Sequence, residues 1–335
     1  MADATFERSR LATVFGGSGF VGRHIVRALA RKGWRVRVAV RRPDLALFLR
    51  TAGAVGQVEP VQANLRFPAS VAAALEGAEM AVNAAGVSAE SGAQTFKAVH
   101  VEGAEAAAAA AKAAGVESYV HISGIGADAD SASAYIASKG RGERATRAAF
   151  PAATILRPSV VFGAEDDFFN RFGALSRMFP ALPLLGGGET RLQPVYAGDV
   201  ARAVAAALSG AAQPGAIYEL GGPQVMTLRE AAELALQAAE RQRMLVGLPV
   251  GASRVLASVT SFANRATLGL FPSALTTTRD QVDLLAQDNV VSGAAEAEGR
   301  TLQGLGIEPQ AAEAIIASYL VRFRRTGQYE PQRSV

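Results

Sequence analysis

The hydrophobic pattern of the first 160 residues alternates between short apolar runs and longer amphipathic runs. The short runs have the length of buried strands, and the longer ones repeat their apolar residues with the period of a helix. Strands alternating with helices of this length predict an α/β fold, a doubly wound parallel sheet of the Rossmann type. The predicted strands are residues 11–15, 34–40, 58–64, 78–83, 118–122 and 153–158, and the helices include 24–30, a long alanine-rich one over 92–114, and one around 135–139.

Beyond residue 160 the pattern becomes mostly helical. Helices are expected over 166–178, 227–241 and 250–268, and Thr227 with Glu230 forms a capping-box pattern at the start of the second. Short strands are expected near 195 and over 216–220. We therefore predict a dinucleotide-binding Rossmann domain at residues 8–165 and a smaller, mostly helical lobe at 166–335, from which some strands return to the sheet.

A glycine turn follows the first predicted strand, with glycines at 16, 19 and 22. In this fold one glycine permits the tight turn, one lets the backbone approach a pyrophosphate, and one lets the helix pack on the strand. Free amides at the helix start then hold the phosphates. A chain with 34 glycines meets this spacing easily by chance, so the strand before and the helix after it carry the prediction. The predicted phosphate-binding residues are Gly16, Gly17, Ser18, Gly19, Phe20, Val21 and Gly22.

The end of the second predicted strand bears on the choice of cofactor. NAD sites usually carry an acidic residue there to bind the ribose 2′-hydroxyl. This chain has Arg41 and Arg42 instead, which favours NADP(H) over NAD(H) because guanidiniums pair with a 2′-phosphate. The alternative is a solvated strand end before Pro43. Two further strand ends are predicted to contact the cofactor, through Asn64, Leu65, Ala84, Ala85 and Gly86.

Tyr135 and Lys139 are the second candidate for chemistry. At a spacing of four residues they share one face of a helix, and a neighbouring ammonium favours the phenolate form of a tyrosine. Such a tyrosine can exchange the proton that accompanies hydride transfer. Ser123, at the end of a predicted strand, could hydrogen-bond the substrate oxygen. The alternative is an ordinary tyrosine and lysine on a surface helix.

Composition excludes several classes. The 34 basic and 30 acidic residues give a net charge of only +4, too mild for a nucleic-acid binder. The chain has no Cys, and its three His show no metal-ligand spacing, so no metal is expected. Charged residues precede any apolar stretch at the N-terminus and no apolar run is long enough to span a bilayer, so neither a signal peptide nor a transmembrane helix is expected.

The segment 250–271 is unusually apolar, with Arg254 and Arg265 as its only charges. Such a helix is either a core element or a docking surface for a membrane or a partner. The sequence leaves both open. If the segment is a docking surface, Phe262→Glu with Phe271→Glu should release the protein from membranes, and if it is core, the double variant should not. Its apolar residues include Val255, Val259, Phe262, Leu268, Leu270 and Phe271.

With the glycine turn, Ser123, Tyr135, Lys139 and the 157–158 Arg-Pro pair in view, residues 10–240 resemble an extended or atypical short-chain dehydrogenase/reductase. That resemblance implies that the tyrosine is the general acid/base, that the lysine binds the nicotinamide ribose, and that the serine orients substrate. It also implies that the loop carrying Pro158, Val160 and Val161 contacts the nicotinamide. The family usually carries Asn where this chain has His100, which puts turnover in question.

Segments 137–143, 162–166 and 287–291 resemble one branch of that family, the nucleotide-binding accessory subunits of bacterial respiratory NADH:ubiquinone oxidoreductase (complex I). This resemblance implies tightly bound NADPH with a structural or assembly role, complex I subunits as partners, and a peripheral position on the cytoplasmic side of the inner membrane. The alternative is an active NADP-dependent oxidoreductase or epimerase, acting on a small carbonyl or sugar-like substrate through Ser123, Tyr135 and Lys139. The sequence leaves turnover, substrate and oligomeric state open.

Overall fold

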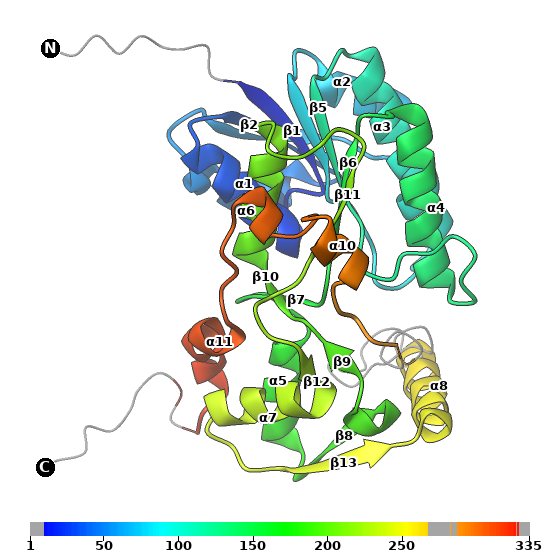
Figure 1. Cartoon of the computed structure of the whole chain (residues 1–335), viewed down its shortest axis with the longest axis vertical. Coiled ribbons are helices and arrows are strands. Elements are labelled where there is room, and N and C mark those ends of the chain that lie inside the picture. Colours follow the sequence, from blue (N-terminus) through cyan, green and yellow to red (C-terminus); the bar gives the residue numbers. More distant parts are fainter. Residues whose placement is uncertain (1–9, 267–281, 283–286, 326, 328–335) are drawn as a thin grey trace, which may run out of the picture. The chain divides into compact units, whose positions relative to one another are not determined.

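The computed structural model describes residues 10–266, 282, 287–325 and 327 (Figure 1). These residues divide into two compact units. The first unit runs to Pro158 and takes back Ala197–Leu220 and Gly293–Glu308, and the second unit holds the remaining described residues. Strand and helix from the later part of the chain thus complete the first unit.

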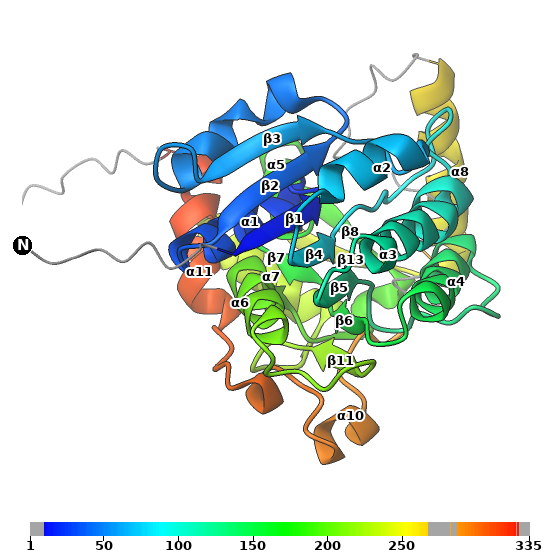
Figure 2. The ribbon, with the colours of Figure 1, turned by 90° about the horizontal axis from the view of Figure 1, so that it is seen from above.

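The first unit is built on a parallel seven-stranded sheet with the order β11-β6-β5-β4-β1-β2-β3 (Figure 2). β1 pairs with both β2 and β4, so the strand order reverses at β1, where ligands bind in such sheets. This topology confirms the predicted Rossmann-type fold. The strands are β1 (Leu11–Phe15), β2 (Arg35–Val40), β3 (Val58–Gln62), β4 (Met80–Asn83), β5 (Ser118–Ile122), β6 (Thr154–Pro158) and β11 (Ile217–Leu220).

Helices cover both faces of this sheet: α1 and α6 pack together on one face, and α2, α3 and α4 pack on the other (Figure 2). Alanines of α3 that are fully buried let this helix lie close against the sheet. The helices are α1 (Phe20–Arg31), α2 (Pro68–Leu75), α3 (Gly103–Ala113), α4 (Ala134–Ala149), α6 (Ala197–Leu208) and α10 (Gly293–Ala297), with the 3₁₀ helices η1 (Pro43–Ala52) and η5 (Gln303–Leu305).

The helix predicted over 92–114 was wrong at its start. It begins at Lys97, and its first six residues form a π-helix, η2 (Lys97–Glu102), before α3 continues. A π-helix shifts the register of the side chains that follow it, and such elements are frequent at functional sites. His100 lies within this turn.

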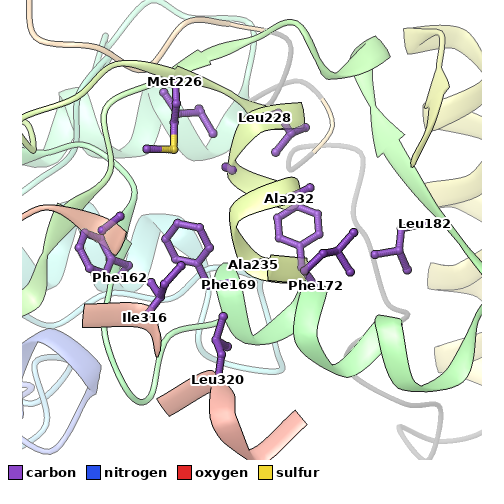
Figure 3. Close-up of a cluster of buried hydrophobic side chains, with 14 of the residues drawn as sticks. Phe162, Phe169, Phe172, Leu182, Met226, Leu228, Ala232, Ala235, Ile316 and Leu320 are labelled. Carbon is purple, nitrogen blue, oxygen red and sulfur yellow. The ribbon is translucent and has the colours of Figure 1, made fainter. Parts of the chain in front are cut away.

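The second unit packs three helices, α5 (Phe169–Met178), α7 (Leu228–Ala238) and α11 (Ala312–Leu320), around one apolar cluster (Figure 3). Within it the rings of Phe162 and Phe169 meet edge-on at 5.7 Å, and Ile316 of α11 belongs to the same cluster. The predicted capping box is confirmed, because Thr227 Oγ1 accepts from the Glu230 amide at 3.1 Å while the Glu230 carboxylate accepts from the Thr227 amide at 2.7 Å. The hydroxyl of Tyr319 donates to Asp166 at 2.6 Å and ties α11 to the residues before α5.

Three two-stranded sheets and a long helix complete this unit. β7 (Val161–Phe162) pairs with β10 (Val195–Tyr196), and β9 (Arg191–Leu192) pairs with β12 (Met226–Thr227). The remaining elements are β8 (Ala181–Leu185), which pairs in parallel with β13 (Met244–Leu248), the helix α8 (Val250–Ala266), and the short 3₁₀ helices η3 (Gly186–Gly188) and η6 (Val321–Phe323). Within the described ranges no helix combines the length and apolar character needed to cross a bilayer.

Candidate cofactor site

The glycine turn joins β1 to α1 with its backbone packed against the loop after β4. Gly16 has φ +73°, and a Cβ there would lie 2.8 Å from the backbone nitrogen of Ala85. A Cβ on Gly22 would collide with the carbonyl oxygen of Gly16. Gly19 is the N-cap residue of α1 and has no side chain to cap the helix. The turn therefore requires glycine for steric reasons and presents backbone amides at the N-terminus of α1, where anions are favoured.

A cleft of about 210 Å³ lies over this turn at the carboxyl ends of the central strands. It brings together residues from four strand ends that the sequence predicted as contacts: Gly16, Ser18, Gly19, Arg41, Asn64, Leu65, Ala84, Ala85 and Gly86. The sequence did not single out the rest of the lining, which is Phe15, Ala39, Val40, Ala63, Arg66, Val87, Gln94 and Val99. Most of these are sequence neighbours of predicted residues at the same strand ends. Extending each predicted strand end by one or two residues would have included them.

The two arginines after β2 have different surroundings. Arg41 lines the cleft. Arg42 instead makes a two-point ion pair with Asp44, at 3.2 and 2.8 Å, and does not line the cleft. This pairing lowers the pKa of the Asp44 carboxyl and raises that of Arg42. Arg66 supplies a second cleft-lining guanidinium, which the sequence analysis missed.

At the other end of the cleft, Gly86 lies close to the side chains of His100 and Lys139. A Cβ on Gly86 would lie 3.5 Å from His100 Nε2 and 3.6 Å from Lys139 Nζ. Burial lowers the pKa of Lys139 to about 8, against the opposing effect of Glu143. Burial also raises the pKa of the Tyr135 phenol. This differs from the activation expected from Lys139, because burial is the cause of the shift and disfavours the phenolate.

His100 is held by hydrogen bonds at both ring nitrogens. Its Nε2 accepts from the Val87 amide at 3.0 Å, and its Nδ1 lies 2.8 Å from Ser138 Oγ. The Ser138 hydroxyl donates to the carbonyl oxygen of Tyr135 at 2.7 Å. Because Nε2 accepts and the serine proton is already given away, Nδ1 must carry the ring proton and donate it to Ser138.

His100 is a neutral imidazole because of its buried position. Burial, with the nearby charge of Lys139, lowers its pKa to about 3. The ring also stacks on Phe96 at 5.5 Å and meets the ring of Tyr135 edge-on at 5.6 Å. His100 therefore fastens the loop after β4 to α4, and its only acceptor nitrogen is occupied by Val87.

Ser123 and the turn after β4 add two more features. The Ser123 hydroxyl is buried, and within the described part of the chain it has no hydrogen-bond partner. Asn83 fixes the turn, since its Oδ1 accepts from the Ala85 amide at 3.1 Å and its Nδ2 lies 3.3 Å from His121 Nδ1. An orphaned buried hydroxyl, the glycine turn and Arg41 all fit a bound dinucleotide. Of the predicted nicotinamide contacts, Pro158 ends β6, whereas Val160 and Val161 belong to the second unit.

Comparisons with known proteins place this site in a family. The model of the NAD dependent epimerase/dehydratase family matches residues 12–221. The chain belongs to this family. Its cofactor class is therefore a nicotinamide dinucleotide, and the resemblance to short-chain reductases is confirmed. A crystal structure titled gox2253 superimposes with a TM-score of 0.70 and covers 96% of this chain and 100% of its own, at 24% identity, which shows the shared fold.

Two curated relatives differ in how much of this chain they match. The "NADH dehydrogenase [ubiquinone] 1 alpha subcomplex subunit 9, mitochondrial" of Arabidopsis thaliana is 33% identical over 95% of this chain and 79% of its own length. The "Ceramide reductase" of Caulobacter vibrioides is 38% identical, but over only 57% of this chain and 58% of its own. The match to the Arabidopsis thaliana protein thus covers nearly the whole chain, whereas the match to the reductase covers little more than half of it.

Proposed function

We propose that this chain is an NADPH-holding accessory subunit of a respiratory NADH:ubiquinone oxidoreductase, with a structural or assembly role. The observation that carries the proposal is the contrast within the cleft. The backbone of the glycine turn and Arg41 line the cleft and can contact a dinucleotide. His100 stands where reductases of this kind usually carry Asn, and it is neutral and hydrogen-bonded at both ring nitrogens. Similarity over 95% of this chain to a protein named as a subunit of that complex supports the same conclusion.

The test is purification of the tagged chain from its native membranes, solubilised with mild detergent. We expect it to travel with NADH:ubiquinone oxidoreductase activity and to release NADPH, about one per chain, on acid or base extraction. A chain that stays in the soluble fraction and reduces carbonyl compounds by itself would instead establish the active reductase.

Cofactor choice depends on Arg41 in this proposal. Arg41→Ala should weaken NADPH binding about 10- to 100-fold, because a charge-assisted bond to the 2′-phosphate is lost, and should leave NADH binding nearly unchanged. Arg42→Ala is the matched control, since that guanidinium is already paired with Asp44, and it should change affinity less than threefold. Equal binding of NADPH and NADH by the unmodified chain would contradict this choice.

The helix α8 supports a peripheral position. Val255 and Val259 are 65% and 59% exposed on one side of it, which leaves an apolar strip uncovered. Of the other predicted docking residues, Phe262 belongs to α8, and Leu268, Leu270 and Phe271 lie outside the described residues. We place this strip against a subunit of the complex, on the cytoplasmic face of the inner membrane.

A two-residue change tests the strip. Val255→Glu with Val259→Glu should release the chain from the complex while NADPH stays bound, because the cofactor cleft belongs to the other unit. Ser258→Glu is the control. It changes a polar residue of the same helix and should leave assembly intact. Retention of the double variant in the purified complex would assign the strip no docking role.

A further inference from the structure

A second surface of the second unit forms where the end of α5 meets the start of β13. The Nε of Arg243 donates to the Ser176 carbonyl at 2.8 Å, and the Met244 amide donates to the Pro180 carbonyl at 3.2 Å. β13 then continues beside β8 in parallel register, from Met244 opposite Ala181 (Figure 1). Residues 176–185 and 241–248 therefore lie side by side.

Two adjoining hollows at this place, of about 380 and 700 Å³, are lined by guanidiniums. Two of the arginines are held in place, since Arg241 Nε donates to the Phe323 carbonyl at 2.7 Å and Arg243 Nε donates to the Ser176 carbonyl. Two carboxylates share the lining, and one of them, Glu240, is paired with Arg324 at 2.9 Å. The lining arginines are Arg229, Arg241, Arg243 and Arg325.

Several of these charges have no counter-charge among the described residues. The terminal nitrogens of Arg241 have no acceptor there, and neither Arg177 nor Arg325 makes a hydrogen bond or ion pair with any residue of the described ranges. Burial, and then the charges of Arg243, Arg177 and Arg325, lower the pKa of Arg241. One cation would satisfy the C-terminus of α7, so this excess of like charge points to an external anion.

Large exposed apolar side chains are the chain neighbours of Arg177 and Arg243. Met178 and Phe179 follow Arg177 and are 49% and 39% exposed, and Met244 and Val246 follow Arg243 and are 69% and 39% exposed. A small soluble phosphate would neutralise the guanidiniums but leave these side chains in water. A lipid surface satisfies both, because its phosphates meet the cations and its interface accepts apolar groups.

We propose that this surface, formed by Arg177, Arg241, Arg243 and Arg325 with Met178, Phe179, Met244 and Val246, docks on a membrane rich in anionic phospholipid. The guanidiniums bind headgroup phosphates, and the apolar side chains enter the headgroup layer. The surface uses neither the cofactor cleft nor α8, so it holds whether or not the chain is a complex I subunit.

The test is co-sedimentation of the purified full chain with vesicles of phosphatidylcholine mixed with phosphatidylglycerol, compared with phosphatidylcholine alone. Arg177→Ala with Arg325→Ala should weaken binding to the mixed vesicles roughly 30-fold, at about 1 kcal/mol for each cation. The matched control, Arg144→Ala with Arg147→Ala, removes two exposed arginines of α4 and should have little effect. Unchanged binding by the first variant, or equal binding to both vesicles, would overturn the proposal.

Two further arms separate a membrane from other anionic ligands. Phe179→Ser with Met244→Ser should also weaken vesicle binding while leaving its salt dependence intact, because only the apolar contribution is lost. Inorganic pyrophosphate should release the unmodified chain no better than sodium chloride of equal ionic strength. Selective release by pyrophosphate, or full binding by the serine variant, would instead assign the arginines to a soluble phosphate ligand.

Discussion

The two ends of the cofactor cleft differ in whether their polar groups are available to a ligand or already bonded within the protein. At the phosphate end, the glycine turn leaves amides at the start of α1, and Arg41 lines the cleft next to a strand end. At the nicotinamide end, His100 is bonded at both ring nitrogens to groups of the protein itself. One end is built to receive a ligand, and the other is built to hold a loop and a helix together.

This difference separates binding from chemistry within one fold. Dinucleotide binding needs backbone amides and positive charge, which the first end supplies. Proton transfer needs groups whose lone pairs and protons are free and whose pKa lies near the working pH. Tyr135 has its pKa raised by burial, and His100 has its pKa lowered to about 3, so neither is poised near neutrality in the protein alone. We therefore propose that this chain retains the family's binding function more fully than its catalytic one.

The largest effect should come from adding a side chain to the glycine turn at the phosphate end. Gly16→Ala places a Cβ 2.8 Å from the Ala85 backbone at φ +73°, so the turn must open. NADPH binding should weaken by at least about 100-fold, which is about 2.7 kcal/mol, as measured by isothermal titration calorimetry.

The control for this change is Gly33→Ala. Gly33 has φ +82°, so alanine suffers similar backbone strain, but a Cβ there meets no atom within 4 Å. Gly33→Ala should lose about 1 kcal/mol of stability and Gly16→Ala at least as much, but only Gly16→Ala should lose cofactor. If Gly33→Ala weakens binding as much as Gly16→Ala, the loss reflects general destabilisation and the phosphate-end assignment is wrong.

A smaller effect should come from pH at the nicotinamide end. Lys139 has a pKa of about 8 because of burial, and a bound ribose and pyrophosphate would favour its ammonium form. Binding then takes up a proton, so the dissociation constant of NADPH should rise about tenfold between about pH 7 and pH 9.5. Unfolding does not explain this direction, because between pH 8 and 10.5 the unfolded lysine binds the extra proton and this group makes the fold more stable as pH rises.

Lys139→Met tests the assignment of that pH dependence. The variant keeps the apolar stem without a titrating group, so its affinity should be low and flat over the same range. His100 and His121, each with a pKa near 3, remain neutral throughout and contribute nothing. A slope that persists in the methionine variant would assign the titration to another group.

The fold and the phosphate end could be predicted from sequence because both depend on local patterns. Alternating strands and helices gave the parallel sheet, and a strand, a glycine spacing and a helix gave the turn at Gly16. Contacts distant in sequence could not be predicted in this way. The pairing of β8 with β13 joins residues about 60 apart, and the bond from His100 to Ser138 spans 38 residues.

Two adjacent arginines illustrate the same limit at close range. Arg41 and Arg42 are equivalent in the sequence, and only the structure shows that the second is paired with Asp44 while the first lines the cleft. The start of the alanine-rich helix was predicted wrongly for a related reason. A π-helix forms at Lys97–Glu102 where tertiary contacts of His100 hold the backbone, and helix periodicity alone contains no such signal.

The smallest effect should come from Tyr135→Phe, and it is the one that separates a binding subunit from an enzyme. The ring keeps its edge-on contacts with Phe96 and His100, each at 5.6 Å, and only the hydroxyl is lost. NADPH affinity should change less than about threefold, or about 0.6 kcal/mol. Assembly into the respiratory complex should be unaffected, as measured by the yield of activity that purifies with the tagged chain. If the unmodified chain consumes NADPH with a carbonyl substrate and Tyr135→Phe abolishes that turnover while NADPH stays bound, then the nicotinamide end is catalytic. The hydrogen bonds of His100 to Val87 and Ser138 would then be compatible with hydride transfer. The difference between the two ends of the cleft would not separate binding from chemistry.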